Sequence, residues 1–173
     1  MSILWITLAL VALQRLGELV YAARNTRRLL ARGAVEIGRE HYPLFILLHG
    51  GWLLALAVLV PDWQAPSWPL LALFLVLQAG RVWVVATLGP YWTTRIITLP
   101  TAPLVVSGPF RFVRHPNYLI VTGEIAVLPL AFGAWQIALV FSVLNALLLA
   151  WRIHVESGAL AVRRGGGAIA SDR

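Results

Sequence analysis

The chain of 173 residues contains no cysteine, no lysine, a single methionine and few charged residues of any kind. Without cysteine the protein has no disulfide framework, no thiolate metal site and no thiol nucleophile. Charged residues make up only 12% of the sequence and apolar residues make up 60%, whereas soluble domains carry about 25% charged residues. This composition excludes an ordinary soluble domain and indicates an integral membrane protein.

Arginine alone supplies the positive charge, and the net charge is +7. A strongly positive net charge often indicates nucleic-acid binding. Most of these arginines, however, lie in the gaps between apolar blocks, where a bilayer tolerates charge. We therefore expect membrane lipids and no nucleic acid as partners. We also expect no metal, because no ligand spacing connects the four histidines, His41, His49, His115 and His154.

The apolar blocks predict an all-α, polytopic membrane protein with about five transmembrane helices. A helix needs roughly 20 apolar residues to cross about 30 Å of hydrocarbon. Glu124 and Pro129 interrupt the fourth helix, which is therefore expected to be short or broken. The blocks lie at about residues 3–21, 43–60, 68–88 and 118–151, and the last is long enough for two helices around a turn at residues 132–135.

The chain is expected to form one membrane domain over residues 1–161, followed by a flexible tail at 162–173. Within this domain, residues 1–88 form the N-terminal helices and residues 89–161 carry the functional half. The connections at residues 22–42 and 89–116 and the segment after residue 151 are basic. Short basic connections stay in the cytoplasm, so we expect a pocket on the cytoplasmic side.

The two long connections have different characters. Arg24, Arg28 and Arg32 recur every four residues and predict a short helix at the interface, in contact with anionic headgroups. The connection at residues 89–116 is rich in proline, glycine and aromatic residues and lacks a helical period. It is therefore expected to form an irregular pocket wall.

Ionisable residues inside apolar spans cost about 2.5 to 3.5 kcal/mol each on insertion scales and are site candidates by default. Arg15 and Glu18 lie three residues apart and can pair on one helix face. Arg81 and Glu124 have no opposite charge nearby in the sequence, so we expect them to meet other helices or the polar connection. Whether these groups are catalytic or structural stays open at this point.

Two further clusters lie in the second half of the chain. Asn145, Arg152 and Glu156 are spaced by seven and four residues and share one stripe of the last helix, whereas His154 points away from it. In the segment RHPNY, Pro116 forces the preceding residue out of helical geometry and can begin a helix. Arg114 and His115 are therefore expected at a helix entrance that can bind an anion.

The run from Pro103 to Leu160, PLVVSGPFRFVRHPNYLIVTGEI followed by a hydrophobic hairpin and RIHVESGAL, resembles the isoprenylcysteine carboxyl methyltransferase family of membrane methyltransferases. The segments RNTRRLLARGAVE and HYPLF are also similar to small bacterial members, so the resemblance covers nearly the whole chain. The ordered pair of RHPxY and a downstream RxxxE is its most specific part.

The resemblance implies an S-adenosylmethionine site in the C-terminal half. Arg152 of RxxxE is then the catalytic residue that faces the acceptor. Members often have a double acid where this chain has Glu156 and Ser157, and eukaryotic members carry a histidine where Ala102 stands. The residues that the resemblance assigns to the cofactor are Pro103, Leu104, Val105, Phe110, His115, Pro116, Asn117, Tyr118 and Glu156.

Methyl transfer from a sulfonium to an oxygen anion merges opposite charges, and a water-poor pocket favours it. A carboxylate acceptor is already ionised, whereas a phenol or enol must lose a proton, with His115 or Tyr118 assisting. The resemblance implies a lipophilic acceptor and leaves two classes open, a prenylated cysteine carboxylate and a small lipid such as an alkylpyrone or alkylresorcinol. A nicotinamide-dependent membrane reductase and a non-catalytic membrane scaffold are alternatives from other classes.

Overall fold

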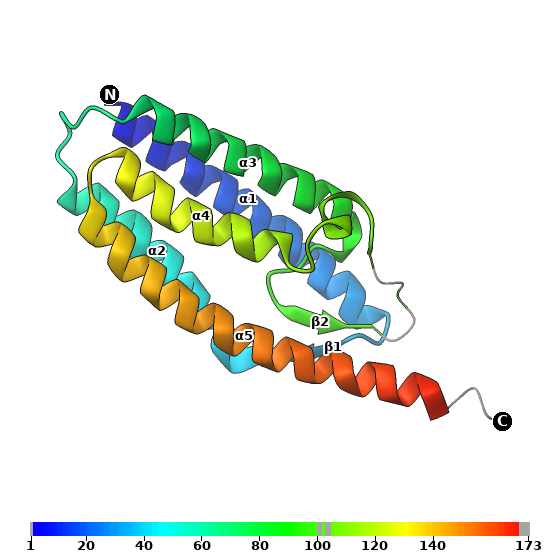
Figure 1. Cartoon of the computed structure of the whole chain (residues 1–173). Coiled ribbons are helices and arrows are strands. Elements are labelled where there is room, and N and C mark those ends of the chain that lie inside the picture. The colour runs from blue at the N-terminus through cyan, green and yellow to red at the C-terminus, as the bar shows by residue number, and fades with distance from the viewer. Residues whose placement is uncertain (1, 100–101, 103–104, 170–173) are drawn as a thin grey trace.

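The computed structural model describes residues 2–99, 102 and 105–169, with the backbone alone for His41 and residues 156–169. Five α-helices run up and down in a bundle (Figure 1). Three short 3-10 turns and a two-stranded sheet complete the connections: η1 Arg39–His41, η2 Gly89–Tyr91, η3 Gly108–Arg111, β1 Val35–Ile37 and β2 Ile96–Thr98. The helices are α1 Ile3–Ala31, α2 Tyr42–Leu59, α3 Trp68–Leu88, α4 Pro116–Ala131 and α5 Trp135–Ile169.

Four of these helices, α1, α2, α3 and α5, are long and apolar enough to cross a membrane. The fourth helix, α4, has 16 residues and rises only about 24 Å at 1.5 Å per residue. Its proline at the first position fixes its start, and the turn after Ala131 ends it. The prediction of a short fourth helix and of the turn at residues 132–135 is confirmed, and the described residues contain four full-length candidate spans rather than five.

The bundle has its apolar side chains on both its inside and its outside. A cluster of side chains from all five helices, including Leu4, Trp52, Phe74, Leu128 and Ile137, is buried between the helices. Many other large apolar side chains are exposed on the outer faces of the helices. Exposed apolar surface on this scale would be unstable in water, so the outer faces are suited to lipid.

All the basic connections lie at one end of the bundle, as the sequence predicts. Figure 1 shows the small sheet and the C-terminal part of α5 at this end, with the N-terminus and the two short loops at the other. The strands pair antiparallel, with Val35 opposite Thr98 and Ile37 opposite Ile96. This pairing ties the α1–α2 connection to the α3–α4 connection, so that both form one cap over the helix ends.

One predicted boundary is wrong. Arg24 and Arg28 belong to α1 itself rather than to a separate interfacial helix, because no proline or glycine lies between Tyr21 and Gly33. Gly33 has a φ of 86° and stops the helix there. The helix α5 extends to Ile169, into the segment for which a flexible tail is predicted. Residues 170–173 of that tail lie outside the described residues.

Candidate active site

A cavity of about 340 Å³ opens between the helices near the end that carries the basic connections. Its walls come from α1 and α2 on one side and from α4, α5 and the segment after η2 on the other. The lining is mostly apolar or aromatic. The polar and aromatic lining residues are Arg15, Glu18, Tyr42, Phe45, His49, Arg81, Trp92, Thr93, Thr94, Asn117, Tyr118 and Arg152.

Arg152 on α5 lies at the wall of this cavity in a fixed orientation. Its Nε donates to the hydroxyl of Tyr118 at 2.9 Å, and its Nη1 donates to the backbone carbonyl of Thr94 at 3.0 Å. The guanidinium also lies over the rings of Phe45, at 5.4 Å, and Tyr118, at 5.9 Å. All these partners are neutral. Among the described side chains, which do not include Glu156, no carboxylate pairs with Arg152.

Tyr118 links this arginine to the segment RHPNY. Pro116 begins α4 and His115 precedes it with φ −128° and ψ 63°, outside helical geometry, which confirms the predicted helix entrance. The His115 ring stacks on the Tyr118 ring with centroids 5.0 Å apart and an angle of 7° between planes. His115 therefore packs behind Tyr118 and does not line the cavity itself.

A buried charge cluster closes the cavity on the side of α1, α3 and α4. Its members are two arginines and two glutamates. Arg15 pairs with Glu18 at 3.3 Å and with Glu124 at 2.6 Å. Arg81 pairs with Glu18 at 2.7 Å and with Glu124 at 3.2 Å. Gln78 also donates to Glu124 at 2.8 Å. The cluster is formally neutral, which makes its burial tolerable.

The predicted pairing of Arg15 with Glu18 is thus confirmed, and so is the expectation that Arg81 and Glu124 meet other helices. The pair is not self-contained, because Glu18 and Glu124 each bind both arginines. Three helices are joined by this cluster at membrane depth.

Three residues of the cavity lining have a buried side-chain polar atom with no hydrogen-bond partner among the described residues. These atoms are Nε of Arg15, the indole Nε1 of Trp92 and the side-chain carbonyl oxygen Oδ1 of Asn117. An unpaired buried polar atom costs about 1–3 kcal/mol.

The remaining predicted site residues are spread around this cavity. Of the predicted site residues whose side chains the structure describes, Asn117, Tyr118 and Arg152 line it. Phe110 packs against the buried cluster around Val84 and Trp92. Pro116 is buried at the start of α4, and Val105 is half-buried in the connection between α3 and α4. Glu156 follows Arg152 by four residues on α5, and its side chain lies outside the described part of the chain. Pro103 and Leu104 lie outside the described residues.

Two residues of the predicted clusters lie away from the cavity. Arg114 is exposed, so the anion-binding corner proposed for it does not face the cavity. Asn145 is buried and donates to Thr122 at 3.3 Å rather than joining Arg152 at the wall.

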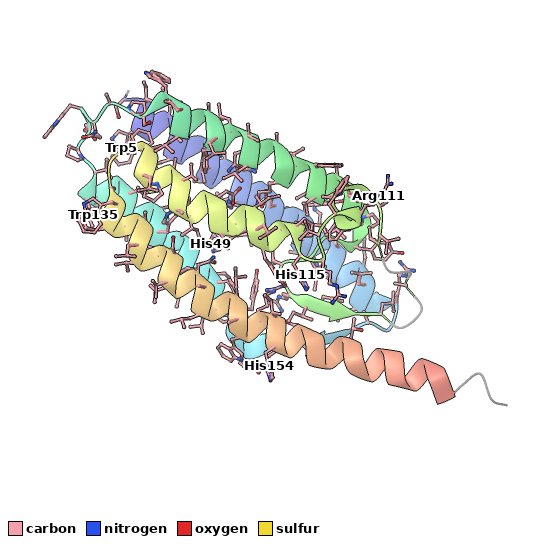
Figure 2. The ribbon with its side chains drawn as sticks, in the orientation of Figure 1. Trp5, His49, Arg111, His115, Trp135 and His154 are labelled. Atoms are coloured by element: carbon pink, nitrogen blue, oxygen red, sulfur yellow. The ribbon has the colours of Figure 1, made fainter. Side chains whose placement is uncertain are left out.

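His49 is the residue that sequence reasoning missed. It lies on α2 and lines the cavity, whereas Figure 2 shows His154 on the outer side of α5, as predicted. The signal was present, because an ionisable side chain in the middle of an apolar span is a site candidate. No group of three or more potential metal ligands occurs among the described residues.

The fold and the cavity define a multi-pass helical membrane protein with a site enclosed by its own helices. Residues 70–162 match the isoprenylcysteine carboxyl methyltransferase family, ICMT. The chain is 38% identical over 160 residues to the uncharacterized protein YpbQ of Bacillus subtilis. The aligned residues cover 90% of this chain and 95% of that protein.

A second relative, an uncharacterized protein of Haemophilus influenzae, is 30% identical over 161 residues, or 90% of this chain and 93% of that protein. No solved structure matches. The chain belongs to the isoprenylcysteine carboxyl methyltransferase family, and membership places it among membrane methyltransferases.

Proposed function

We propose that the protein transfers a methyl group from S-adenosylmethionine to an oxygen atom of a lipophilic acceptor bound in the cavity. The observation that carries the proposal is Arg152: its guanidinium is held by neutral partners at the wall of an apolar cavity. A cation in this position orients an acceptor through its oxygen anion, and a bidentate arginine contact gives that orientation geometric precision. Arg152 is therefore the proposed catalytic residue.

The cavity suits the methyl donor chemically. Its lining combines apolar and aromatic side chains with the polar side chains of Thr93, Thr94 and Asn117, which suits a ligand that has both apolar and polar parts. When bound, S-adenosylmethionine supplies a methyl group on a positively charged sulfur. From the resemblance we assign its binding to Pro103, Leu104, Val105, Phe110, His115, Pro116, Asn117, Tyr118 and Glu156.

The charge balance of the reaction favours this environment. An oxygen anion and a sulfonium lose their charges as the new bond forms, so the transition state is less polar than the reactants. A cavity that excludes water therefore lowers the barrier. Arg152 holds the oxygen anion in place without needing to remove a proton when the acceptor is a carboxylate.

The acceptor reaches the cavity from the bilayer. Leu16 on α1 and Ile46 on α2 both line the cavity and are 58% and 47% exposed on the lipid-facing surface. The resemblance favours a prenylated cysteine carboxylate as the acceptor. A histidine in the cavity favours the second class, a small lipid with a phenolic or enolic hydroxyl, such as an alkylresorcinol or alkylpyrone.

We further propose that the basic end of the bundle faces the cytoplasm, because short arginine-rich connections stay on that side. The methyl donor is then bound from the cytoplasm and the acceptor from the membrane. In this proposal residues 1–161 form one methyltransferase domain, in which residues 89–161 are the catalytic half that carries Arg152 and the residues assigned to the methyl donor.

Calorimetry on the detergent-purified protein tests the proposal. Wild type is expected to bind S-adenosylhomocysteine with micromolar affinity, and Glu156→Ala is expected to abolish this binding. Arg152→Ala is expected to abolish methyl transfer while the affinity for S-adenosylhomocysteine stays within a few fold, because its partner is the acceptor. Arg24→Ala, exposed on α1 outside the cavity, is the matched control and is expected to change neither value.

A folded wild-type protein that binds no S-adenosylhomocysteine contradicts the proposal. Binding of a nicotinamide dinucleotide in its place would support the reductase, and binding of neither would support the scaffold. Equal loss of cofactor binding and of transfer in Arg152→Ala would show that the role given to this arginine is wrong.

A further inference from the structure

His49 lines the cavity, and one of its two ring nitrogens is bound to the backbone of its own helix. Its Nδ1 lies 2.8 Å from the backbone carbonyl oxygen of Phe45, one turn earlier on α2. A carbonyl only accepts, so Nδ1 carries the proton of this hydrogen bond. The neutral imidazole then has its lone pair on Nε2. This Nε2 makes no hydrogen bond to the part of the chain that the structure describes.

The other titratable oxygens of the cavity lining are engaged. Glu18 accepts from Gln14 and binds both arginines of the charge cluster. The Tyr118 hydroxyl accepts from Arg152. The Tyr42 hydroxyl accepts from the hydroxyl of Thr94 at 3.2 Å. Among the described lining residues, His49 therefore has the base that is best placed to take a proton from a ligand.

His49 also lies close to the arginine that orients the acceptor. Phe45 and His49 are four residues apart on α2, which places them about 6 Å apart along the helix axis. The Arg152 guanidinium lies 5.4 Å from the Phe45 ring. A ligand bound in the cavity beside Phe45 is therefore within reach of both the cation and the base.

We propose that His49 is the general base of the reaction and that the acceptor is a weakly acidic lipid hydroxyl, a phenol or an enol. This inference rests on the proposed function. A carboxylate is ionised at neutral pH and needs no base, whereas a phenol has a pKa of about 10.

The proposed reaction combines a proton transfer to His49 with a methyl transfer to the acceptor oxygen. The acceptor O–H bond breaks and its proton moves to Nε2 of His49. The acceptor oxygen forms a bond to the methyl carbon, and the carbon–sulfur bond of the methyl donor breaks with its electron pair remaining on sulfur. The products are the methyl ether, S-adenosylhomocysteine and a protonated His49, which returns its proton to water when the products leave. Arg152 stabilises the oxygen anion while it forms.

Two phenols of different acidity separate a base from a merely structural residue. The probes are para-dodecylphenol and its ortho-nitro derivative, whose hydroxyl is far more acidic. His49→Gln is expected to lower kcat on para-dodecylphenol by about 100-fold. On the nitro derivative, assayed at a pH above its pKa so that it is largely ionised in solution, the loss is expected to be threefold or less. His154→Gln, on the outer side of α5, is the matched control and is expected to leave both rates unchanged.

Two further measurements do not depend on turnover by the glutamine variant. With S-adenosylhomocysteine in the site and at a pH near the pKa of the nitro derivative, its visible absorbance reports its ionised fraction, which is expected to fall in His49→Gln. In His49→Ala, added imidazole is expected to restore transfer to para-dodecylphenol. Calorimetry with S-adenosylhomocysteine is expected to give wild-type affinity for both variants.

Equal losses on the two phenols, or an unchanged ionised fraction, would overturn the role of His49. A wild type that binds S-adenosylhomocysteine and methylates N-acetyl-S-farnesylcysteine but neither phenol would overturn the acceptor class and leave the proposed function standing. A wild type that binds no S-adenosylhomocysteine would instead remove the proposed function itself.

Discussion

Neutralising Glu124 tests the buried charge cluster. This carboxylate is 1% exposed and binds Arg15 at 2.6 Å, Arg81 at 3.2 Å and Gln78 at 2.8 Å. Glu124→Gln keeps the shape and one acceptor oxygen but removes the charge. Two arginines then face the single carboxylate of Glu18 in a medium from which water is excluded. Breaking a buried ion pair in this way costs about 3–5 kcal/mol.

The assay is unfolding of the purified protein in detergent, followed by tryptophan fluorescence. A loss of 3–5 kcal/mol corresponds to a fall in Tm of roughly 6–20 °C for a chain of this size. The double variant Glu124→Gln with Arg15→Gln restores the charge balance and is expected to be more stable than Glu124→Gln alone. Glu36→Gln is the control. Its pair with Arg95 is more exposed and is expected to contribute about 1 kcal/mol or less.

A Glu124→Gln variant that loses no more stability than Glu36→Gln would contradict a stabilising role for the charge balance of the cluster. So would a double variant whose loss equals the sum of the losses measured for Glu124→Gln and Arg15→Gln separately, because the charge balance would then have no energetic effect.

Three further predictions concern packing, the loop that carries the cavity wall, and the geometry of the site. Gly123→Ala would bring a Cβ within 3.0 Å of the Leu77 side chain and is expected to cost about 1–3 kcal/mol, whereas Gly17→Ala meets open space and is expected to cost nothing in thermal unfolding. Asn25→Ala removes two hydrogen bonds to the carbonyls of the segment after α3 and is expected to lower the free energy of unfolding by about 1–3 kcal/mol. Arg152→Lys keeps the charge but cannot reproduce the bonds made through Nε and Nη1, so kcat is expected to fall at least tenfold while calorimetry gives wild-type affinity for S-adenosylhomocysteine.

Much of the fold could be predicted because span length and hydropathy are local properties. The bounds of α3 coincide with the predicted block, and the turn after Ala131 lies where glycine follows phenylalanine. The first helix was predicted to end about ten residues too early, since the basic residues after Tyr21 were read as a change of element. A basic stretch continues a helix equally well when no glycine or proline stops it.

The small sheet was missed for a different reason. Each strand has three residues, and a run that short carries too little periodicity to distinguish a strand from an irregular segment. Its existence depends on the pairing of Val35 with Thr98, which are far apart in the chain.

The candidate site could be predicted only in part, again because it depends on contacts between segments that are far apart in the chain. Tyr118 and Arg152 were assigned to the site from one motif each, but their hydrogen bond is a product of helix packing.

The sequence by itself determined that this chain crosses a membrane several times, that its basic connections gather at one end, and which ionisable residues lie at membrane depth. These properties follow from the order of apolar and charged residues along the chain, because a bilayer acts on each segment separately. Only the tertiary structure decided that Glu18 and Glu124 share two arginines and that His49 faces the same cavity as Arg152. These contacts depend on how each helix is rotated and packed against its neighbours. The rotation is set by packing energy, which is summed over residues far apart in the sequence.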